Sequence, residues 1–263
     1  MSSPLPIPAP LQSFDDKAAA LQSSLASLAT THARYTTLNQ RNAILPNSLD
    51  ALRVELTYHS NAIEGSTLTL RETQLVLEGR SPANKSLREV YEARNHDRAL
   101  RMVEEWAATR PASVPLTEQD LLAVHAHVMA DIDTPSAGRL RTERVLIQGT
   151  RFIPPGSHKF GELLPALLSL ANRPGIHPVA QAAELHYNLV AVHPFNDGNG
   201  RTARLLMNYH LMRNGYPFAI IEVERRAEYL AALEEANTGR WEPFATYLIQ
   251  SLDRTMHRLI GSE

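Results

Sequence analysis

The sequence contains no cysteine, which excludes disulfides, thiolate metal sites and cysteine nucleophiles. It also lacks a run of about eighteen consecutive apolar residues, the length that a membrane-spanning helix needs. The N-terminal stretch MSSPLPIPAPLQSF has neither the basic nor the apolar region of a secretory signal. From these absences we expect a soluble protein without membrane contacts, located in the cytoplasm.

Neither sign of charge is in large excess. The formal net charge is −2 over 263 residues, which gives no bulk attraction for nucleic acid or for an anionic membrane. We therefore expect neither as a partner. Apolar residues make up 43% and charged residues 21%, as in an ordinary globular protein, and the length is ample for a buried core.

Helical periodicity dominates the chain, and helices are often bounded by recognisable residues. Thr69 and Thr117 are suited to capping helix starts, and Gly65 to ending a helix. The pattern predicts helices over about 15–37, 47–64, from 69 onward, 86–108, 117–131, 161–170, 178–192, 201–213, 226–237 and 243–260.

One segment differs from this helical pattern. RVLIQGTRFIPP (144–155) contains two short apolar runs separated by Gln148, Gly149 and Thr150, which predicts a small β-hairpin. The expected fold class is therefore all-α, with a helical core and one hairpin. We expect three regions: a flexible tail rich in proline and serine over 1–13, an N-terminal helical region over 14–110, and a third region over 111–263.

The stretch HPFNDGNGRTAR (193–204) has the composition of an anion site. Gly198 and Gly200 flank Asn199, and all three tolerate positive φ, so successive backbone N–H groups can point at one anion. The stretch leads into a helix N-terminus, which also favours anions. Arg201 and Arg204 are three apart, so they share a helix face and can reach different phosphates.

Two further residues of this stretch suggest chemistry. His193 is suited to act as a base near neutral pH, and Asp197 is a hard oxygen ligand suited to Mg²⁺. Together with the anion site, they predict that a polyphosphate binds with Mg²⁺ and undergoes a group transfer that needs a base.

Other interpretations of the same residues are weaker. Each of them alone could belong to an ordinary loop. A transition-metal site built from His186, His193 and Asp197 competes badly, because the arginines would repel the metal and no second ligand pair is present. The chain has no G-x-x-x-x-G-K-[ST] motif, so it is not a P-loop enzyme.

The stretch 193–204 resembles the Fic family motif, H-P-F-x-[DE]-G-N-G-R-x-x-R, at every fixed position. The resemblance extends over about 60–260 and is to the metazoan endoplasmic-reticulum type and its bacterial relatives. It implies a helical fold with a β-hairpin flap, in which 111–263 forms the catalytic core with its C-terminal helices. It also implies transfer of AMP from ATP to a Ser, Thr or Tyr hydroxyl of a target protein.

The resemblance implies specific roles. His193 would deprotonate the target hydroxyl, Asp197 would hold Mg²⁺, and Arg204 would hold the γ-phosphate. Glycine at position 200, where relatives that phosphorylate have lysine, favours nucleotidyl transfer. The residues expected to bind the nucleotide are Asn196, Gly198, Asn199, Gly200, Arg201, Arg204, Tyr229, Leu230 and Asn237.

SNAIEG (60–65) resembles the inhibitory pattern of the family, [ST]-x-x-x-E-[GN]. Ser60 and Glu64 are four apart and share a helix face. By this resemblance, Glu64 would pair with Arg204 and deprive the γ-phosphate of its cation. In the metazoan relative the same glutamate supports removal of AMP, so the reverse reaction stays open.

The expected hairpin would dock the target by pairing with its backbone, so that the target adds an extra strand to the hairpin. The residues expected to make this contact are Val145, Leu146, Ile147, Gln148 and Gly149. The resemblance also leaves a homodimer open. Three alternatives remain: transfer from UTP, GTP or CDP-choline, a nucleotide-sensing module without turnover, and a structural helical oligomer.

Overall fold

The computed structural model describes residues 7–111, 113–147 and 150–261, and these are helical with irregular connections. The α-helices are α1 Ala19–Gln40, α2 Pro46–Ile63, α3 Leu70–Leu77, α4 Leu87–Thr109, α5 Glu118–Met129, α6 Phe160–Ala171, α7 Pro178–Val192, α8 Asn199–Arg213, α9 Arg226–Asn237 and α10 Glu242–Ile260. The 3₁₀ turns Ser157–Lys159 and Val223–Arg225 precede α6 and α9. The expected helical class is confirmed.

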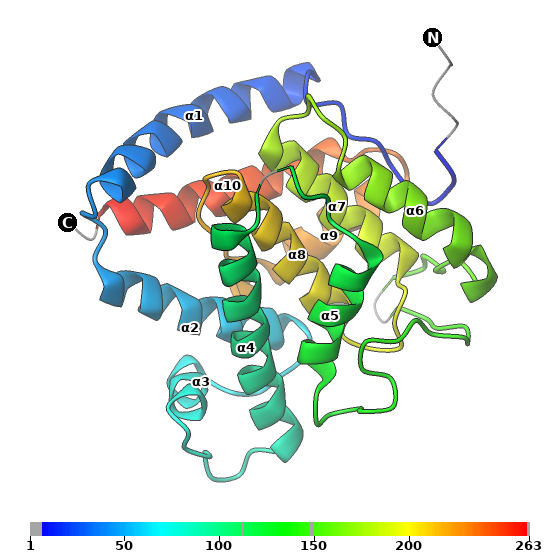
Figure 1. Ribbon diagram of the computed structural model, residues 1–263, viewed down its shortest axis with the longest axis horizontal. Helices are drawn as coiled ribbons and strands as arrows, with labels where there is room; N and C mark the ends of the chain where they lie inside the picture. Colours follow the sequence, from blue (N-terminus) through cyan, green and yellow to red (C-terminus); the bar gives the residue numbers. More distant parts are fainter. Residues whose placement is uncertain (1–6, 112, 148–149, 262–263) are drawn as a thin grey trace.

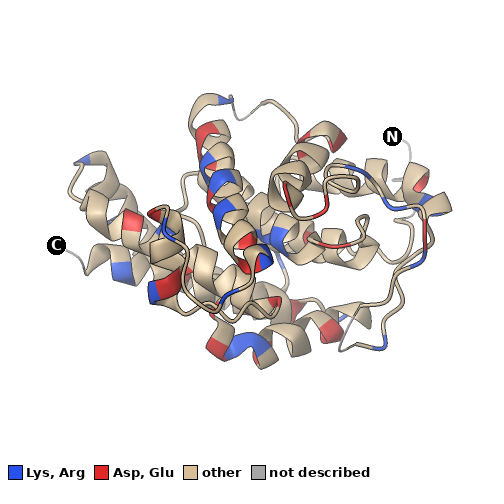
Figure 2. Cartoon of the chain, turned by 90° about the horizontal axis from the view of Figure 1, so that it is seen from below, with Lys and Arg blue, Asp and Glu red and all other residues tan. Residues whose placement is uncertain are grey.

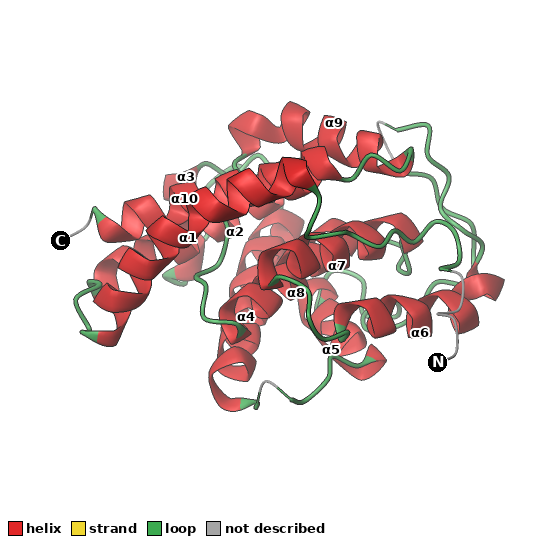
Figure 3. Ribbon diagram, turned by 90° about the horizontal axis from the view of Figure 1, so that it is seen from above, coloured by secondary structure: helices red, strands yellow, loops and turns green. Residues whose placement is uncertain are grey.

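Helices α7 and α8 form the centre of the molecule (Figure 1). Helix α4 and helix α5 pack on α8, α6 packs on α7, and α1 runs along α10 at one edge (Figures 1 and 3). Residues 179–189 and 201–211 are all buried, so the two central helices have no solvent face. The loop between them is consequently anchored at both ends.

The two expected regions 14–110 and 111–263 both contribute side chains to the same hydrophobic core. The core extends from Leu11 to Ile260, and the expected boundary near 110 stays a prediction. Leu11 is buried although it lies in the expected tail. Residues 1–6 of that tail lie outside the described part of the chain.

Local signals for helix ends are confirmed. The Thr69 side chain accepts a hydrogen bond from the Glu72 N–H, and the Glu72 carboxylate accepts one from the Thr69 N–H, which is a capping box. Thr117 caps α5 in the same way, with Asp120. Gly65 follows α2 with φ of 103°, a conformation that favours glycine.

The predicted β-hairpin is wrong for the part of 144–155 that is described, which contains no strand. Gln148 and Gly149 lie outside the described residues. The physical reason lies at the base of the segment, where the Arg141 side chain donates to the carbonyls of Glu143 and Pro155. Prolines 154 and 155 also have no N–H to donate to a ladder.

Positions of Lys and Arg and positions of Asp and Glu are interspersed along the helices and loops drawn in Figure 2. This mixture of the two signs is in line with the formal net charge of −2. Within the described ranges, no helix is both long enough and apolar enough to cross a membrane.

Candidate active site

The loop between α7 and α8 holds the motif residues in a fixed conformation. His193, directly after α7, has a left-handed backbone conformation with φ of 50°. Gly198, directly before α8, is also left-handed, with φ of 75°. Between them, the Asn199 side chain accepts a hydrogen bond from the Phe195 N–H at 3.0 Å and donates one to the Phe195 carbonyl at 2.9 Å. The Asn199 amide, expected to bind phosphate, is therefore used to close the loop.

His125 on α5, which the sequence analysis did not identify, supports this loop. Its ring stacks on Phe195 with centroids 3.7 Å apart. Nδ1 accepts a hydrogen bond from the Gly138 N–H, so Nε2 carries the proton and donates to the Asp197 carbonyl at 3.0 Å. Burial lowers the pKa of His125 to about 4, which keeps the ring neutral at pH 7.

The His193 ring is arranged to accept a proton. Its Nδ1 lies 3.2 Å from the Val190 carbonyl. Because a carbonyl oxygen only accepts, Nδ1 carries the proton and Nε2 keeps its lone pair. Burial lowers the pKa of His193 to about 4, and Arg141 also lowers it. At neutral pH the ring is uncharged, as a general base requires.

Arg141 ties His193 to the segment 143–155. Its side chain is buried, and Nε donates to the His193 carbonyl at 2.7 Å. Its other nitrogens donate to the carbonyls of Glu143 and Pro155, both at 2.6 Å. No local pattern indicates this role, because the contact with His193 spans 52 positions.

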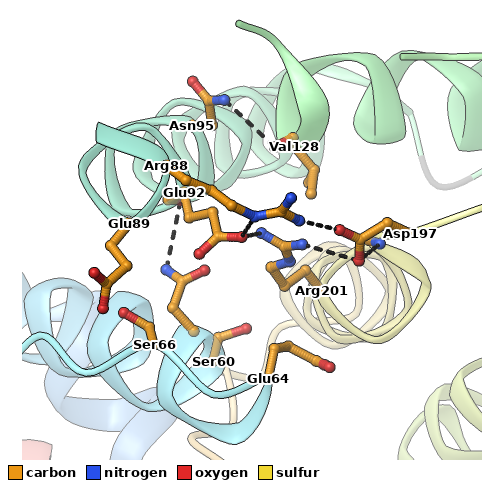
Figure 4. Close-up of polar contacts among 12 residues, drawn as sticks. Ser60, Glu64, Ser66, Arg88, Glu89, Glu92, Asn95, Val128, Asp197 and Arg201 are labelled. Carbon is orange, nitrogen blue, oxygen red and sulfur yellow. Dashed lines mark hydrogen bonds and ion pairs between the residues drawn. The ribbon is translucent and has the colours of Figure 1, made fainter. Parts of the chain in front are cut away.

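Each oxygen of the Asp197 carboxylate has its own partner (Figure 4). Oδ1 accepts from the Gly198 N–H at 2.6 Å and lies 3.3 Å from Arg201 Nη2. Oδ2 accepts from Arg88 Nη2 at 2.5 Å. Burial raises the pKa of Asp197, but Arg201, the Gly198 N–H and Arg88 outweigh it and hold the pKa below its ordinary value.

The donor set at Asp197 suits Mg²⁺ that arrives with a nucleotide. Among the described residues, no group of three or more His, Asp or Glu side chains could hold a metal by itself. Mg²⁺ is commonly held by one or two carboxylates together with phosphate oxygens and water. The half-exposed, ionised Asp197 can supply such a carboxylate.

Arg201, at the start of α8, is buried to 2% exposure. Its Nη1 lies 3.2 Å from Glu92 Oε1 on α4 (Figure 4), and its Nε has no hydrogen-bond partner among the described residues. A buried guanidinium with an unused donor is suited to an anionic ligand. Asn196 lies exposed on the preceding loop, and Gly200 is half-buried.

The structure brings both expected inhibitory residues onto Arg204. Arg204 Nη2 donates to Glu64 Oε1 at 2.7 Å and to the Ser60 carbonyl at 2.8 Å, and its Nε donates to Ser60 Oγ at 3.0 Å. A Cβ at Gly200 would lie only 2.2 Å from Glu64 Oε1. Glycine at this position therefore leaves the room that the Glu64 carboxylate occupies.

A cavity of about 550 Å³ lies between the C-terminal end of α7, α9 and the segment that includes Ile147 and Phe152. Ala191, two positions before His193, lines it. Leu230 and Asn237, which were expected to contact the nucleoside, line this cavity; that contact stays a prediction. Asn237 Oδ1 accepts a hydrogen bond from the Tyr187 hydroxyl at 3.3 Å. The lining is mainly apolar with a few polar groups, as in small-molecule sites generally.

Tyr229, expected at the nucleoside, points into the core instead. It is 2% exposed, and its hydroxyl lies 3.1 Å from His186 Nε2. The hydroxyl also interacts with Arg204, and burial raises the pKa of Tyr229 to about 12. The structure thus places Tyr229 behind Arg204 and away from the cavity.

The segment expected to dock the target is apolar and partly exposed. Leu146 is 81% exposed and Ile153 is 71% exposed, whereas Val145 and Ile147 are half-buried. Exposed apolar side chains next to an active site are suited to a protein partner.

Comparison with known proteins bears on the whole chain. Residues 115–211 match the model of the Fic/DOC family. A solved fragment of Fic-1 from C. elegans is 34% identical, with a TM-score of 0.80 over 92% of this chain and 72% of that fragment. The chain belongs to the Fic/DOC family. A Fic family protein from Desulfovibrio desulfuricans is 27% identical, with a TM-score of 0.82 over 95% of this chain and 77% of its own.

Curated relatives of this Fic protein are also similar over most of its length. Protein adenylyltransferase fic-1 of Caenorhabditis elegans is 40% identical over 209 residues, which are 78% of this chain and 41% of the relative. Protein adenylyltransferase Fic of Drosophila melanogaster is 34% identical over 250 residues, 94% of this chain and 49% of the relative. The chain thus spans less than half the length of these relatives.

Proposed function

We propose that this Fic protein transfers AMP from ATP to a hydroxyl side chain of a target protein, and that Glu64 restrains the reaction. The observation that carries the proposal is the order of groups along one fixed loop. A neutral imidazole, an ionised carboxylate, a helix N-terminus and a buried arginine follow one another beside a cavity of nucleoside size.

The transfer step uses groups of this chain. The target hydroxyl oxygen forms a bond to the α-phosphorus, while the bond from that phosphorus to the oxygen bridging to the β-phosphate breaks. His193 Nε2 takes the hydroxyl proton, and pyrophosphate leaves. The N–H groups at the start of α8 and the Arg201 guanidinium stabilise the phosphate charge. Mg²⁺, when bound at Asp197, supplies further positive charge to the phosphates.

The restraint on AMP transfer follows from the contacts of Ser60 and Glu64 with Arg204, which we call the Glu64 clamp. With Glu64 bound to its Nη2, the guanidinium is not available to hold a γ-phosphate, so ATP binds with its phosphates in an unproductive arrangement. Glu64 itself is half-exposed at the C-terminal end of α2, so the clamp can open without unfolding of the core.

Removal of AMP is a second candidate, supported by the position of Glu64. Its charge acts on His193, raising the pKa of that ring against the dominant effect of burial, so the two groups share one site. Glu64 would orient a water and take one of its protons, while the water oxygen bonds to the phosphorus of the modified protein and the bond from that phosphorus to the side-chain oxygen breaks. The small fraction of His193 that carries two ring protons at neutral pH would give one to the departing side-chain oxygen, and AMP would leave.

The partners and donor remain proposals as well. A protein target would dock at Val145, Leu146 and Ile147, and Leu230 and Asn237 would contact the base. UTP, GTP and CDP-choline are the alternative donors. A homodimer and a cytoplasmic location stay predictions from the sequence.

The decisive experiment compares two labels. Glu64→Gly would be incubated with cell lysate, Mg²⁺, and ATP labelled with ³²P at either the α- or the γ-phosphate. Incorporation of the α-label alone supports AMP transfer, and an excess of unlabelled UTP or GTP should not suppress it. Labelling counts only where it exceeds that of Glu64→Gly with His193→Ala in the same lysate, because kinases of the lysate also incorporate the γ-label. An excess of the γ-label alone would show phosphorylation by this protein, and no excess of either label would contradict transfer from ATP.

A further inference from the structure

Four charged side chains from two parts of the chain form a closed ring beside the catalytic loop (Figure 4). Arg88 Nε donates to Glu92 Oε1 at 3.1 Å within α4, and Arg201 Nη1 lies 3.2 Å from the same oxygen. Arg201 Nη2 and Arg88 Nη2 then contact the two oxygens of Asp197, at 3.3 and 2.5 Å. The charges alternate around the ring.

The two oxygens of Asp197 have different tasks in this ring. Oδ1 is held by the Gly198 N–H at 2.6 Å and by Arg201, both of which belong to the catalytic loop and α8. These contacts fix the orientation of the carboxylate. Oδ2 is bound by Arg88, which comes from α4, outside the loop and α8.

The ring is buried on one side and open on the other. The side chains of Arg201 and Glu92 are 2% and 13% exposed, whereas those of Arg88 and Asp197 are 57% and 44% exposed. The Arg88–Asp197 contact is therefore the part that can open at low cost, because an exposed ion pair contributes little to stability.

Because Oδ1 is already held by the Gly198 N–H and Arg201, Oδ2 is the oxygen that would bind a metal ion. We propose that Arg88 masks Oδ2 of Asp197, and that a nucleotide with its Mg²⁺ must displace Arg88 to bind. This inference rests on the proposed function. It places a second restraint at the metal end of the site, separate from the Glu64 clamp at the γ-phosphate end. The Arg88 guanidinium and a metal ion cannot both bind Oδ2, because the two positive charges repel each other and would occupy the same space.

The test uses ADP, which has no γ-phosphate and therefore does not need Arg204. The affinity of the full chain for ADP would be measured by calorimetry in Mg²⁺ and in EDTA. The ratio of the affinity in Mg²⁺ to the affinity in EDTA tells how much the metal strengthens ADP binding. Arg88→Ala would be compared with Arg98→Ala, an exposed arginine of the same helix, ten positions and about 15 Å farther along it.

Arg88→Ala should raise the ratio about three- to fivefold, the scale of an exposed ion pair, and Arg98→Ala should leave it unchanged. The ratio separates masking from a general loss of positive charge, which would weaken ADP binding in EDTA as well. A ratio for Arg88→Ala equal to or below that of the wild type would overturn the masking role alone. Failure of every variant to bind ADP in either buffer would overturn the proposed function, and this inference with it.

Discussion

The ionisation of His193 follows from its burial more than from any single neighbour. Burial lowers its pKa to about 4, because a charged imidazole loses hydration inside the protein. We therefore expect the ring to stay neutral from about pH 6 to pH 8, where an ordinary histidine titrates. NMR titration of the ring resonances, assigned by their loss in His193→Ala, measures this directly, and a midpoint between about pH 6 and 7 would contradict it.

The motif residues were predictable from the sequence because they are contiguous. The run 193–204 points to His193, Asp197 and the two arginines as candidate site residues without any knowledge of the fold. The side-chain directions were not predictable. Tyr229 points into the core because it packs against His186 of α7, a contact across 43 positions. The Asn199 amide closes the loop through Phe195, only four positions away, but the composition of the loop fits a phosphate contact equally well.

Among the elements, the segment 143–155 depends on Arg141 for its attachment to the catalytic loop. Arg141→Ala would leave three backbone carbonyls without their donor, and each lost hydrogen bond costs about 1 kcal/mol. We expect the free energy of unfolding in urea to fall by roughly 2–4 kcal/mol.

The matched control is Arg139→Ala, an exposed arginine two positions away, for which we expect a change within about 0.5 kcal/mol. If the two variants lost the same stability, the described role of Arg141 would be wrong.

Helix starts were predictable where the signal is local, and less so where distant residues intervene. Thr69 and Thr117 cap helices as expected. The first helix begins at Ala19, later than the expected start at 15. The reason is that the Asp16 carboxylate accepts from the His177 N–H at 2.7 Å, a contact across 161 positions. The hairpin prediction fails for a different reason, because the Arg141 side chain engages the carbonyls of Glu143 and Pro155 at the base of the segment.

Over the whole molecule, the N-terminal segment is fastened to α7 by a buried carboxylate. Glu184 Oε1 accepts from the Phe14 N–H at 2.7 Å and from Arg173 Nη2 at 2.8 Å, and the Phe14 ring stacks on Trp241 with centroids 4.6 Å apart. Burial raises the pKa of Glu184 to about 7, against the opposing effects of the Phe14 N–H and Arg173.

This buried carboxyl predicts how stability depends on pH. Between its ordinary pKa of 4.5 and about 7, the folded chain retains a proton that the unfolded chain has lost. The contribution to stability is therefore complete below 4.5 and is lost as the pH rises through 7. Glu184→Gln should remove this decline in thermal unfolding midpoints between about pH 5 and pH 8, whereas the exposed Glu162→Gln should retain it. An unchanged decline in Glu184→Gln would count against this assignment.

The central claim is that the Glu64–Arg204 contact restrains AMP transfer by His193. The most direct measurement is the initial rate of ³²P transfer from α-labelled ATP with Mg²⁺ and cell lysate, compared among the wild type, Glu64→Gly, and Glu64→Gly with His193→Ala. Freeing one charged hydrogen-bond donor for phosphate should raise the rate about 10- to 100-fold in Glu64→Gly, and the added His193→Ala should abolish the gain. Equal rates in the wild type and Glu64→Gly, or a gain that survives His193→Ala, would contradict it.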